Sequence, residues 1–182
     1  MAVAVYWVLP WSESGDNGDQ RERLWRMLVT DQPPGRTGLI GIGYQGCELG
    51  PFLAGLARDG VGVVADVRLT PVSRKRGFSK RALAEALADA GIEYRHLPVL
   101  GNPKHNRAGF AGTEVELMEA RRRYAAGLLT HQATETLALI TQLAAVRRVA
   151  LLCFEADQRR CHRDVIAAAI ADPAAFAIPQ EA

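Results

Sequence analysis

Four apolar runs, each followed by a turn and a helical segment, constrain the fold of this 182-residue chain most strongly. They lie within residues 37–46, 61–68, 92–101 and 148–155. The run at 61–68, VGVVADVR, is continuous and rich in β-branched residues, which is typical of a strand covered on both faces. Strands that alternate with helices predict an α/β fold: a single three-layer, Rossmann-like domain whose mostly parallel sheet has about four to five strands. The alternative is a mixed sheet in which the strand at 92–101 runs antiparallel.

The helical segments between these strands have recognisable ends. Ser79 can cap the helix that follows it, and Gly91 stands where a C-terminal cap belongs. The sequence TEVE, which begins at Thr113, predicts a capping box. We expect helices at residues 48–60, 80–91, 113–129, 131–146 and 161–171. Residues 102–112 are expected to form a long loop.

The composition is that of a soluble globular protein, with 48% hydrophobic and 23% charged residues. A net charge of only +2 gives no general attraction to nucleic acid or membrane. The apolar start, MAVAVYWVLPW, is too short to span a bilayer and lacks the features of a secretory signal. Three widely spaced cysteines do not suggest a disulfide framework, so we expect a cytoplasmic protein with no membrane partner.

Residues 1–36 are expected to form an N-terminal extension, partly flexible or docked, and residues 37–182 the α/β domain. The extension is rich in turn and linker residues, yet it holds every tryptophan of the chain: Trp7, Trp11 and Trp25. Because tryptophan is costly to leave in water, part of the extension is expected to dock on the domain or on another subunit. The alternative is that translation starts at Met27. The sequence leaves the oligomeric state open.

Most of the reactive side chains follow the predicted strands directly. These segments are residues 43–46, 66–80, 96–107 and 154–163. In a parallel sheet they lie along the carboxyl edge, where such folds bind their ligands. Four separate segments therefore predict one site at this edge.

The predicted site carries an excess of positive charge. Six cations and no acid occur from Arg68 to Arg81, and three cations and no acid from Arg95 to Arg107. In a nearly neutral protein such clusters favour a phosphate, a carboxylate or a nucleic-acid backbone as ligand. The run from Arg74 to Arg76 is, by itself, equally consistent with a solvated surface loop.

The glycine turn at residues 41–46, GIGYQG, has the string of a dinucleotide-binding loop between a strand and a helix. The bulk of Tyr44 and Gln45 argues against close approach of a pyrophosphate. The acid expected further along is Asp66, which belongs to a strand-end motif of its own. We therefore expect no cofactor, and interpret the turn as a source of backbone N–H donors for another anion.

Two cysteines lie in the last strand–helix unit. Cys153 falls inside the apolar strand and is interpreted as a core residue. Cys161 falls where the helix begins, a position at which the helix dipole and neighbouring arginines lower a thiol pKa. Cys161 and His162 are adjacent, a spacing that rarely directs both side chains at one ion, so no metal is expected.

Glu155 is the acid most strongly expected to act in catalysis. It ends the fourth strand, faces the basic edge and precedes an anion-binding helix start. A carboxylate there can act as a general base or a nucleophile. The alternative is an ion pair with a neighbouring arginine. Asp66 is the second candidate base, and its alternative is an ion pair with a loop arginine.

Several of these segments together resemble the family named domain of unknown function 488. The motifs are GIGYQG, DVR-x-x-P-x-SRK-x-GFSK, YRHLPVLGNP, and LLCFE followed by CHR, from about Thr37 to Ala171. The resemblance implies a compact α/β domain of bacterial and archaeal cytoplasm and supplies no reaction. The family motif positions correspond to Tyr44, Gln45, Gly46, Asp66, Arg68, Pro71, Ser73, Arg74, Phe78, Ser79, Lys80, His96, Leu100, Gly101, Glu155, Cys161, His162 and Arg163.

The residues favour an enzyme that acts on a phosphate-bearing substrate by hydrolysis or glycosyl transfer. A nucleotide, a nucleotide-sugar or a nucleic-acid end would fit. The expected catalytic residues are Glu155, Asp66, His162, Cys161 and His96. The expected substrate-binding residues are Tyr44, Gln45, Gly46, Arg68, Ser73, Arg74, Lys75, Lys80 and Arg163. The alternatives are a non-catalytic nucleic-acid-binding module that uses the basic loop at 68–81, and thiol chemistry at Cys161.

Overall fold

The computed structural model of the chain describes residues 5–7 and 37–173, which form one α/β domain. Its strands are β1 (Val5–Trp7), β2 (Gly38–Gly43), β3 (Val61–Asp66), β4 (Glu93–His96) and β5 (Arg148–Cys153). Its helices are α2 (Leu49–Arg58), α3 (Lys80–Asp89), α4 (Lys104–Ala111), α5 (Glu114–Gly127), α6 (His131–Val146) and α7 (His162–Ala171). A 3₁₀ turn, η1 (Pro98–Leu100), follows β4. No helix among these is long and apolar enough to cross a bilayer.

The strands form one sheet in the order β1-β2-β5-β3-β4, and every neighbouring pair runs parallel. The predicted α/β fold with a parallel sheet is therefore confirmed. The mixed-sheet alternative is wrong, because β4 pairs with β3 in parallel register, Val64 opposite Tyr94. The parallel direction follows from α3, which carries the chain back across the sheet between these two strands.

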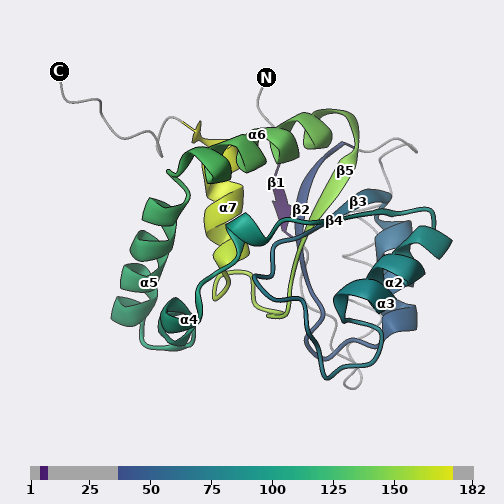
Figure 1. The fold of residues 1–182 in the computed structure, drawn as a ribbon, viewed down its shortest axis with the longest axis horizontal. Helices are drawn as coiled ribbons and strands as arrows, with labels where there is room; N and C mark the ends of the chain where they lie inside the picture. The colour runs from purple at the N-terminus through teal and green to yellow at the C-terminus, as the bar shows by residue number, and fades with distance from the viewer. Residues whose placement is uncertain (1–4, 8–36, 174–182) are drawn as a thin grey trace, which may run out of the picture.

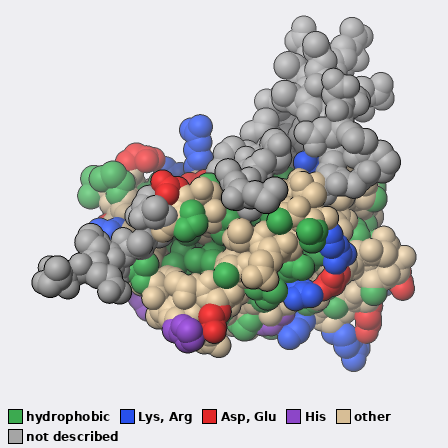
Figure 2. Space-filling view, turned by 90° about the horizontal axis from the view of Figure 1, so that it is seen from above, with side chains coloured by type: hydrophobic (Ala, Val, Ile, Leu, Met, Phe, Trp, Pro, Cys, Tyr) green, Lys and Arg blue, Asp and Glu red, His purple; other side chains and the backbone are tan. Residues whose placement is uncertain are grey.

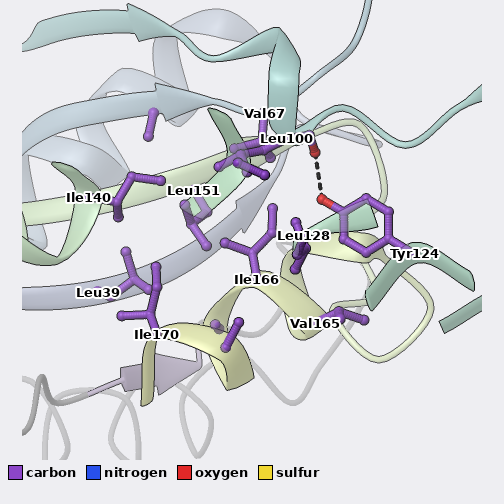
Figure 3. Packing of buried hydrophobic residues seen from close by; sticks show 14 of the residues in the cluster. Leu39, Val67, Leu100, Tyr124, Leu128, Ile140, Leu151, Val165, Ile166 and Ile170 are labelled. Atoms are coloured by element: carbon purple, nitrogen blue, oxygen red, sulfur yellow. Dashed lines mark hydrogen bonds between the residues drawn. The ribbon is translucent and has the colours of Figure 1, made fainter. Parts of the chain in front are cut away.

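Helices cover both faces of the sheet, as Figure 1 shows, with α2 and α3 on one side and α5 and α7 on the other. Successive strand residues point to opposite faces. In β2, Ile40 packs in the cluster under α2 and α3, whereas Leu39 joins the cluster under α6 and α7. Figure 3 shows Leu39 in this second cluster with Ile140 and Ile166. All six residues of β5, the central strand, are buried.

The helix that follows β5 leaves the sheet on the opposite face from its neighbours. The helices after β2 and β3 are α2 and α3, and they share one face, while α7 packs on the other. Such a change of side opens a crevice at the carboxyl end of the strand concerned, which is where open α/β sheets bind ligands. A ligand site is therefore expected at the carboxyl end of β5.

Part of the N-terminal extension adds a strand to the sheet. Residues Val5–Trp7 pair in parallel with β2, and Val5 lies opposite Leu39. The predictions about Trp11, Trp25 and Met27 concern residues outside those that the structure describes.

Two local predictions are wrong. Residues 104–111, predicted as loop, form helix α4, which packs against α5. Gly109 permits this approach, since a Cβ there would lie 2.7 Å from the Cβ of Ala120. The strand expected at 92–101 stops at His96, because the chain turns into a 3₁₀ helix at Pro98.

The predicted caps have different outcomes. Thr113 and Glu116 form the capping box at the start of α5, as predicted. Gly91 adopts a positive φ of 71° after α3, which suits a C-terminal cap. Ser79 does precede α3, but its hydroxyl makes no cap; it donates to the carbonyl of Ser73 at 3.2 Å and stabilises the preceding loop instead.

Candidate functional site

A cleft of about 940 Å³ opens beyond the carboxyl ends of β3 and β5. The segments after β2, β3, β4 and β5 all contribute to its lining. The lining residues are Tyr44, Arg68, Leu69, Thr70, Val72, Ser73, Arg74, Lys75, Asn102, Arg107, Phe110, Ala111, Gly112, Cys153, Phe154, Glu155, Asp157, Arg160, Cys161 and His162. The cleft lies where the change of helix side at β5 opens the sheet edge.

The structure brings some of the predicted site residues into this cleft and leaves others outside it. Those in the lining are Glu155, Cys161, His162, Tyr44, Arg68, Ser73, Arg74 and Lys75. Those outside the lining are Asp66, His96, Gln45, Gly46, Lys80 and Arg163. Apart from Gly46, the residues of the outer group support the cleft wall and floor through their hydrogen bonds.

Asp66 is fully buried and holds Arg68 by two hydrogen bonds, Nε to Oδ1 at 2.8 Å and Nη2 to Oδ2 at 2.6 Å. Tyr94 donates its hydroxyl to the same carboxylate at 2.6 Å. Arg68 also donates from Nη1 to Tyr44 Oη at 2.9 Å and to the carbonyl of Phe78 at 2.8 Å. Burial lowers the pKa of Arg68, but the bonds and charge of Asp66 outweigh it and raise that pKa. The pair stabilises the wall in its charged form.

His96 and Lys80 link β4 to the loop after β3. His96 Nε2 lies 3.0 Å from the carbonyl oxygen of Arg68, and Lys80 Nζ lies 3.2 Å from His96 Nδ1. Since a carbonyl only accepts and an ammonium only donates, these two partners match the tautomer with its hydrogen on Nε2. Both ring nitrogens are thus engaged away from the cleft, which favours a supporting role for this histidine.

The glycine turn after β2 makes room for the protein's own backbone. A Cβ on Gly43 would lie 1.9 Å from the carbonyl oxygen of Glu155. Gln45 Oε1 accepts from the backbone N–H of Ala156 at 3.1 Å and fixes the same loop. The loop after β5 occupies the space that a pyrophosphate would need over these glycines, which accords with the interpretation against a dinucleotide.

Glu155 has an unpaired carboxylate in the cleft. Neither of its carboxylate oxygens has a hydrogen-bond or ion-pair partner among residues 5–7 and 37–173. Arg160, one of the neighbouring arginines, instead bonds Glu114 at 2.7 Å and the carbonyl of Gly112 at 2.6 Å. Partial burial raises the pKa of Glu155, and the negative charge of Cys161 adds to the rise. An unpaired acid of raised pKa is suited to accept a proton.

Cys153, Cys161 and His162 form a buried cluster at the floor of the cleft, where β5 ends and α7 begins. His162 Nδ1 lies 3.7 Å from the sulfur of Cys161 and 3.9 Å from that of Cys153. Arg163 Nε donates to the sulfur of Cys161 at 3.2 Å. The sequence predicts Cys153 as a core residue, which agrees with its burial, but it does not predict that Cys161 and His162 lie beside it.

The two thiols of this cluster differ in acidity. Burial raises the pKa of Cys161, but the hydrogen bond from Cys153 and the charge of Arg163 outweigh it and lower that pKa well below its ordinary value. The bond to Cys161 and burial raise the pKa of Cys153. Cys161 is therefore the more acidic thiol of the pair.

Cations with unsatisfied donors also line the cleft. Arg74 is exposed and has no hydrogen-bond or ion-pair partner in the described part of the chain. Arg107 donates only from Nε, to the carbonyl of Asn102 at 3.0 Å. Lys75 pairs with Glu48 at 3.1 Å. The face seen in Figure 2 instead shows side chains of both signs interspersed, so it presents no comparable cluster of one sign.

Reasoning from the sequence did not select several residues of the lining. Arg107, Asn102, Phe154 and Asp157 all belong to segments that follow strands. The sequence could have indicated Arg107, because this residue ends the second run of cations that contains no acid. The inward position of Asn102 depends on α4, which the sequence analysis predicted as a loop.

Comparison with known proteins gives one match. The family described as "Domain of unknown function DUF488" matches residues 49–170, which leaves out the GIGYQG turn. No curated protein and no solved structure matches the chain.

Proposed function

The chain belongs to the DUF488 family, and from this premise we propose that it is an enzyme that hydrolyses a phosphate-bearing substrate in the cleft. One observation carries the proposal: the unpaired carboxylate of Glu155 shares the cleft with the unsatisfied guanidinium groups of Arg74 and Arg107. Guanidinium groups bind phosphate oxygens through two parallel hydrogen bonds. An acid beside them can activate water.

The proposed reaction is a displacement by water. Glu155 takes a proton from a water molecule as its oxygen attacks the substrate, and the protonated acid then returns this proton to the leaving oxygen or nitrogen. The bond that breaks is a phosphoester or a glycosidic bond, so nucleotides, nucleotide-sugars and nucleic-acid ends are the substrate class. Transfer to a sugar or another acceptor uses the same groups with an alcohol in place of water.

Supporting residues hold these groups without touching the substrate. Asp66 fixes Arg68, and Arg68 fixes the hydroxyl of Tyr44 in the cleft wall. Arg163 donates to the backbone carbonyl of Glu155 and so fixes the strand end that presents this acid. We assign Asp66 and Arg163 to positioning, in place of the direct roles that the sequence predicts for them.

A nucleic-acid-binding module without catalysis has less support. Single strands are bound through aromatic faces on which bases stack. Phe78 is fully buried and stacks on Tyr44 with 4.4 Å between ring centroids, so it offers no face to a base. Phe110 is buried as well, and of the aromatic side chains in the lining only Phe154, which is 43% exposed, offers a face to a base. The basic loop at 68–81 retains Arg74 as a phosphate contact, which serves a nucleotide equally well.

Thiol chemistry at Cys161 is the second candidate, since Arg163 holds a hydrogen bond to its sulfur. Access argues against it. Cys161 is only 1% exposed, so a substrate would have to reach a sulfur that α7 and β5 enclose. The cytoplasmic location also remains a proposal, supported by three cysteines that are all free.

The proposal is tested first by ligand binding and turnover. A thermal-shift screen of nucleotides, phosphosugars and short oligonucleotides should identify a ligand, since saturation at about 100 times Kd adds about 2.7 kcal/mol of stability. The identified ligand should be hydrolysed by the wild-type protein. Arg74→Ala and Arg107→Ala should each weaken binding about 10- to 100-fold, because each removes charge-assisted hydrogen bonds.

Arg81→Ala is the matched control, because Arg81 is exposed on α3 outside the cleft and its one ion-pair partner among the described residues is Glu85. Equal weakening by Arg81→Ala would show that general charge, and not the cleft, attracts the ligand. A bound phosphate ester that no preparation hydrolyses would contradict the proposed reaction.

A further inference from the structure

Three buried donor atoms from β5 and α7 face one another at the floor of the cleft. The sulfurs of Cys153 and Cys161 and Nδ1 of His162 all lie within 4.8 Å of one another. We infer that Cys153, Cys161 and His162 bind one Zn²⁺ ion, with its fourth coordination position open to the cleft. The adjacency of Cys161 and His162 does not prevent this, since Cys153 closes the set from the neighbouring strand.

The two sulfur–nitrogen distances of the cluster are close to those between the ligands of a tetrahedral zinc ion. With Zn–S bonds of about 2.3 Å and Zn–N bonds of about 2.0 Å, a sulfur and a nitrogen ligand lie about 3.6 Å apart. The observed sulfur–nitrogen distances are 3.7 Å for Cys161 and 3.9 Å for Cys153. The two sulfur–nitrogen distances are therefore within a few tenths of an ångström of a bound geometry, and the two sulfurs lie within 4.8 Å of each other.

The orientation of His162 is that of a metal ligand. Its Nε2 lies 3.0 Å from the carbonyl oxygen of Val67, so Nε2 carries the hydrogen. The lone pair of Nδ1 then points at the two sulfurs. Metal-binding histidines donate their other ring nitrogen to a carbonyl or carboxylate in the same way. The ring of Tyr124, 5.3 Å away between centroids, limits rotation of the imidazole.

The charges around the cluster suit zinc with an anion in the open position. Two thiolates neutralise the ion, and Arg163, which donates to the sulfur of Cys161, places a positive charge beside it. That charge favours hydroxide or a phosphate oxygen as the fourth ligand. No further cysteine, histidine or carboxylate joins the three donors within the described residues, and three protein ligands with one open position are typical of catalytic zinc.

This inference extends the proposed function. If that function is correct, the open position holds the attacking water, whose pKa zinc lowers to about 7, next to Glu155. The sulfurs have two other uses: a free nucleophile at Cys161, or a disulfide between Cys153 and Cys161. The first engages one sulfur and the second only the two sulfurs, whereas all three donor atoms face one another, and for this reason zinc is the occupant that we propose.

The test is metal binding by the full-length protein, reduced with a phosphine and stripped with a chelator. Zn²⁺ should bind with one equivalent per chain, and Co²⁺ should give the sulfur-to-metal charge-transfer band of a tetrahedral thiolate site. Cys153→Ser, Cys161→Ser and His162→Ala should each lower the affinity at least about 100-fold, more than the loss of an outer-shell partner does. Cys47→Ser is the control and should bind as the wild type does, because Cys47 packs in the opposite core.

The wild-type protein alone provides a test that does not depend on folding of the variants. Bound Zn²⁺ should slow alkylation of Cys153 and Cys161 at least about tenfold and leave Cys47 unchanged. Absence of stoichiometric binding, or alkylation of Cys161 at the same rate with and without Zn²⁺, would overturn the inference. A zinc-loaded protein that hydrolyses no phosphate ester would refute the proposed function and leave the zinc site standing. Hydrolysis by a zinc-free protein would support the proposed function and refute only the role of the ion in holding the attacking water.

Discussion

Asp66→Asn is expected to destabilise the fold strongly, because Asp66 is the only acid that compensates the buried guanidinium of Arg68 in the described structure. The asparagine keeps the size of the side chain and one carbonyl oxygen. It cannot accept both bonds from Arg68 and the bond from Tyr94, and it carries no charge. Besides Tyr44 and the carbonyl of Phe78, Arg68 would keep only what the single carbonyl oxygen of the asparagine can accept.

The size of the effect follows from the burial of the pair. Asp66 is 0% exposed and Arg68 is 6% exposed, so water cannot replace the lost interactions. Removing one member of a buried ion pair costs about 3–5 kcal/mol. Domains of this kind unfold with a total of about 5–15 kcal/mol, so the change removes a large part of the stability.

The assay is urea unfolding of the wild type, Asp66→Asn, Tyr94→Phe and Arg81→Ala. Tyr94→Phe loses one hydrogen bond to a charged group and should cost about 1.5–3 kcal/mol. Arg81→Ala breaks only an exposed pair with Glu85 and should cost less than about 1 kcal/mol. If Asp66→Asn cost no more than Arg81→Ala, the claim that Asp66 supports the cleft wall through Arg68 would be wrong.

Three further outcomes follow from other parts of the fold. Gly43→Ala should lower the urea midpoint well below that of Gly50→Ala, because its Cβ would meet the backbone of Glu155 at 1.9 Å whereas Gly50 has open space within α2. Hydrogen bonds from Arg95 and Arg147 lower the pKa of Glu93, so the stability that Glu93 adds is present above about pH 4.5 and is lost as pH falls through its lower folded pKa. Urea unfolding of the wild type and Glu93→Gln should therefore converge at acid pH; a constant difference would contradict this pairing. Thr113→Ala should cost about 1 kcal/mol and shift helix melting by circular dichroism, since it removes the hydroxyl that accepts from the backbone N–H of Glu116; an unchanged transition would count against that cap.

The parallel sheet was predictable because its signals are local. Each strand is a short apolar run, each helix has its own periodicity, and alternation of the two leaves few possible topologies. The order of the strands was not predictable in the same way. The residues RVALLCFE do not indicate that β5 lies between β2 and β3, because that position depends on the packing of α6 and α7 with the rest of the chain.

Helix α4 was missed for the opposite reason: it has almost no local signal. It contains eight residues, includes Gly109, and has no side-chain cap. Isolated helices of this length are marginal in water, so packing against α5 provides its stability. The inward position of Asn102 depends on the same packing and was missed with it.

The candidate site was also predictable only in part. The gathering of Glu155, Arg74 and Cys161 at one sheet edge follows from the parallel sheet, which the sequence predicts. The contacts that distinguish their roles do not follow from it. The sulfur of Cys153 and Nδ1 of His162 lie 3.9 Å apart because the loop after β5 folds back over Gly43. No spacing of residues in the sequence predicts this fold of the loop.

Turnover by Glu155→Gln is the most direct test of the central claim that Glu155 activates water for hydrolysis in this cleft. The matched control is Asp157→Asn, since Asp157 lines the same cleft but accepts a hydrogen bond from the backbone of Arg159 at 2.9 Å. With the ligand from the thermal-shift screen, Glu155→Gln should keep its Kd within a few-fold and lose about 10²- to 10⁴-fold in kcat. Asp157→Asn should keep both. Undiminished kcat in Glu155→Gln would contradict the assignment of Glu155 as the base.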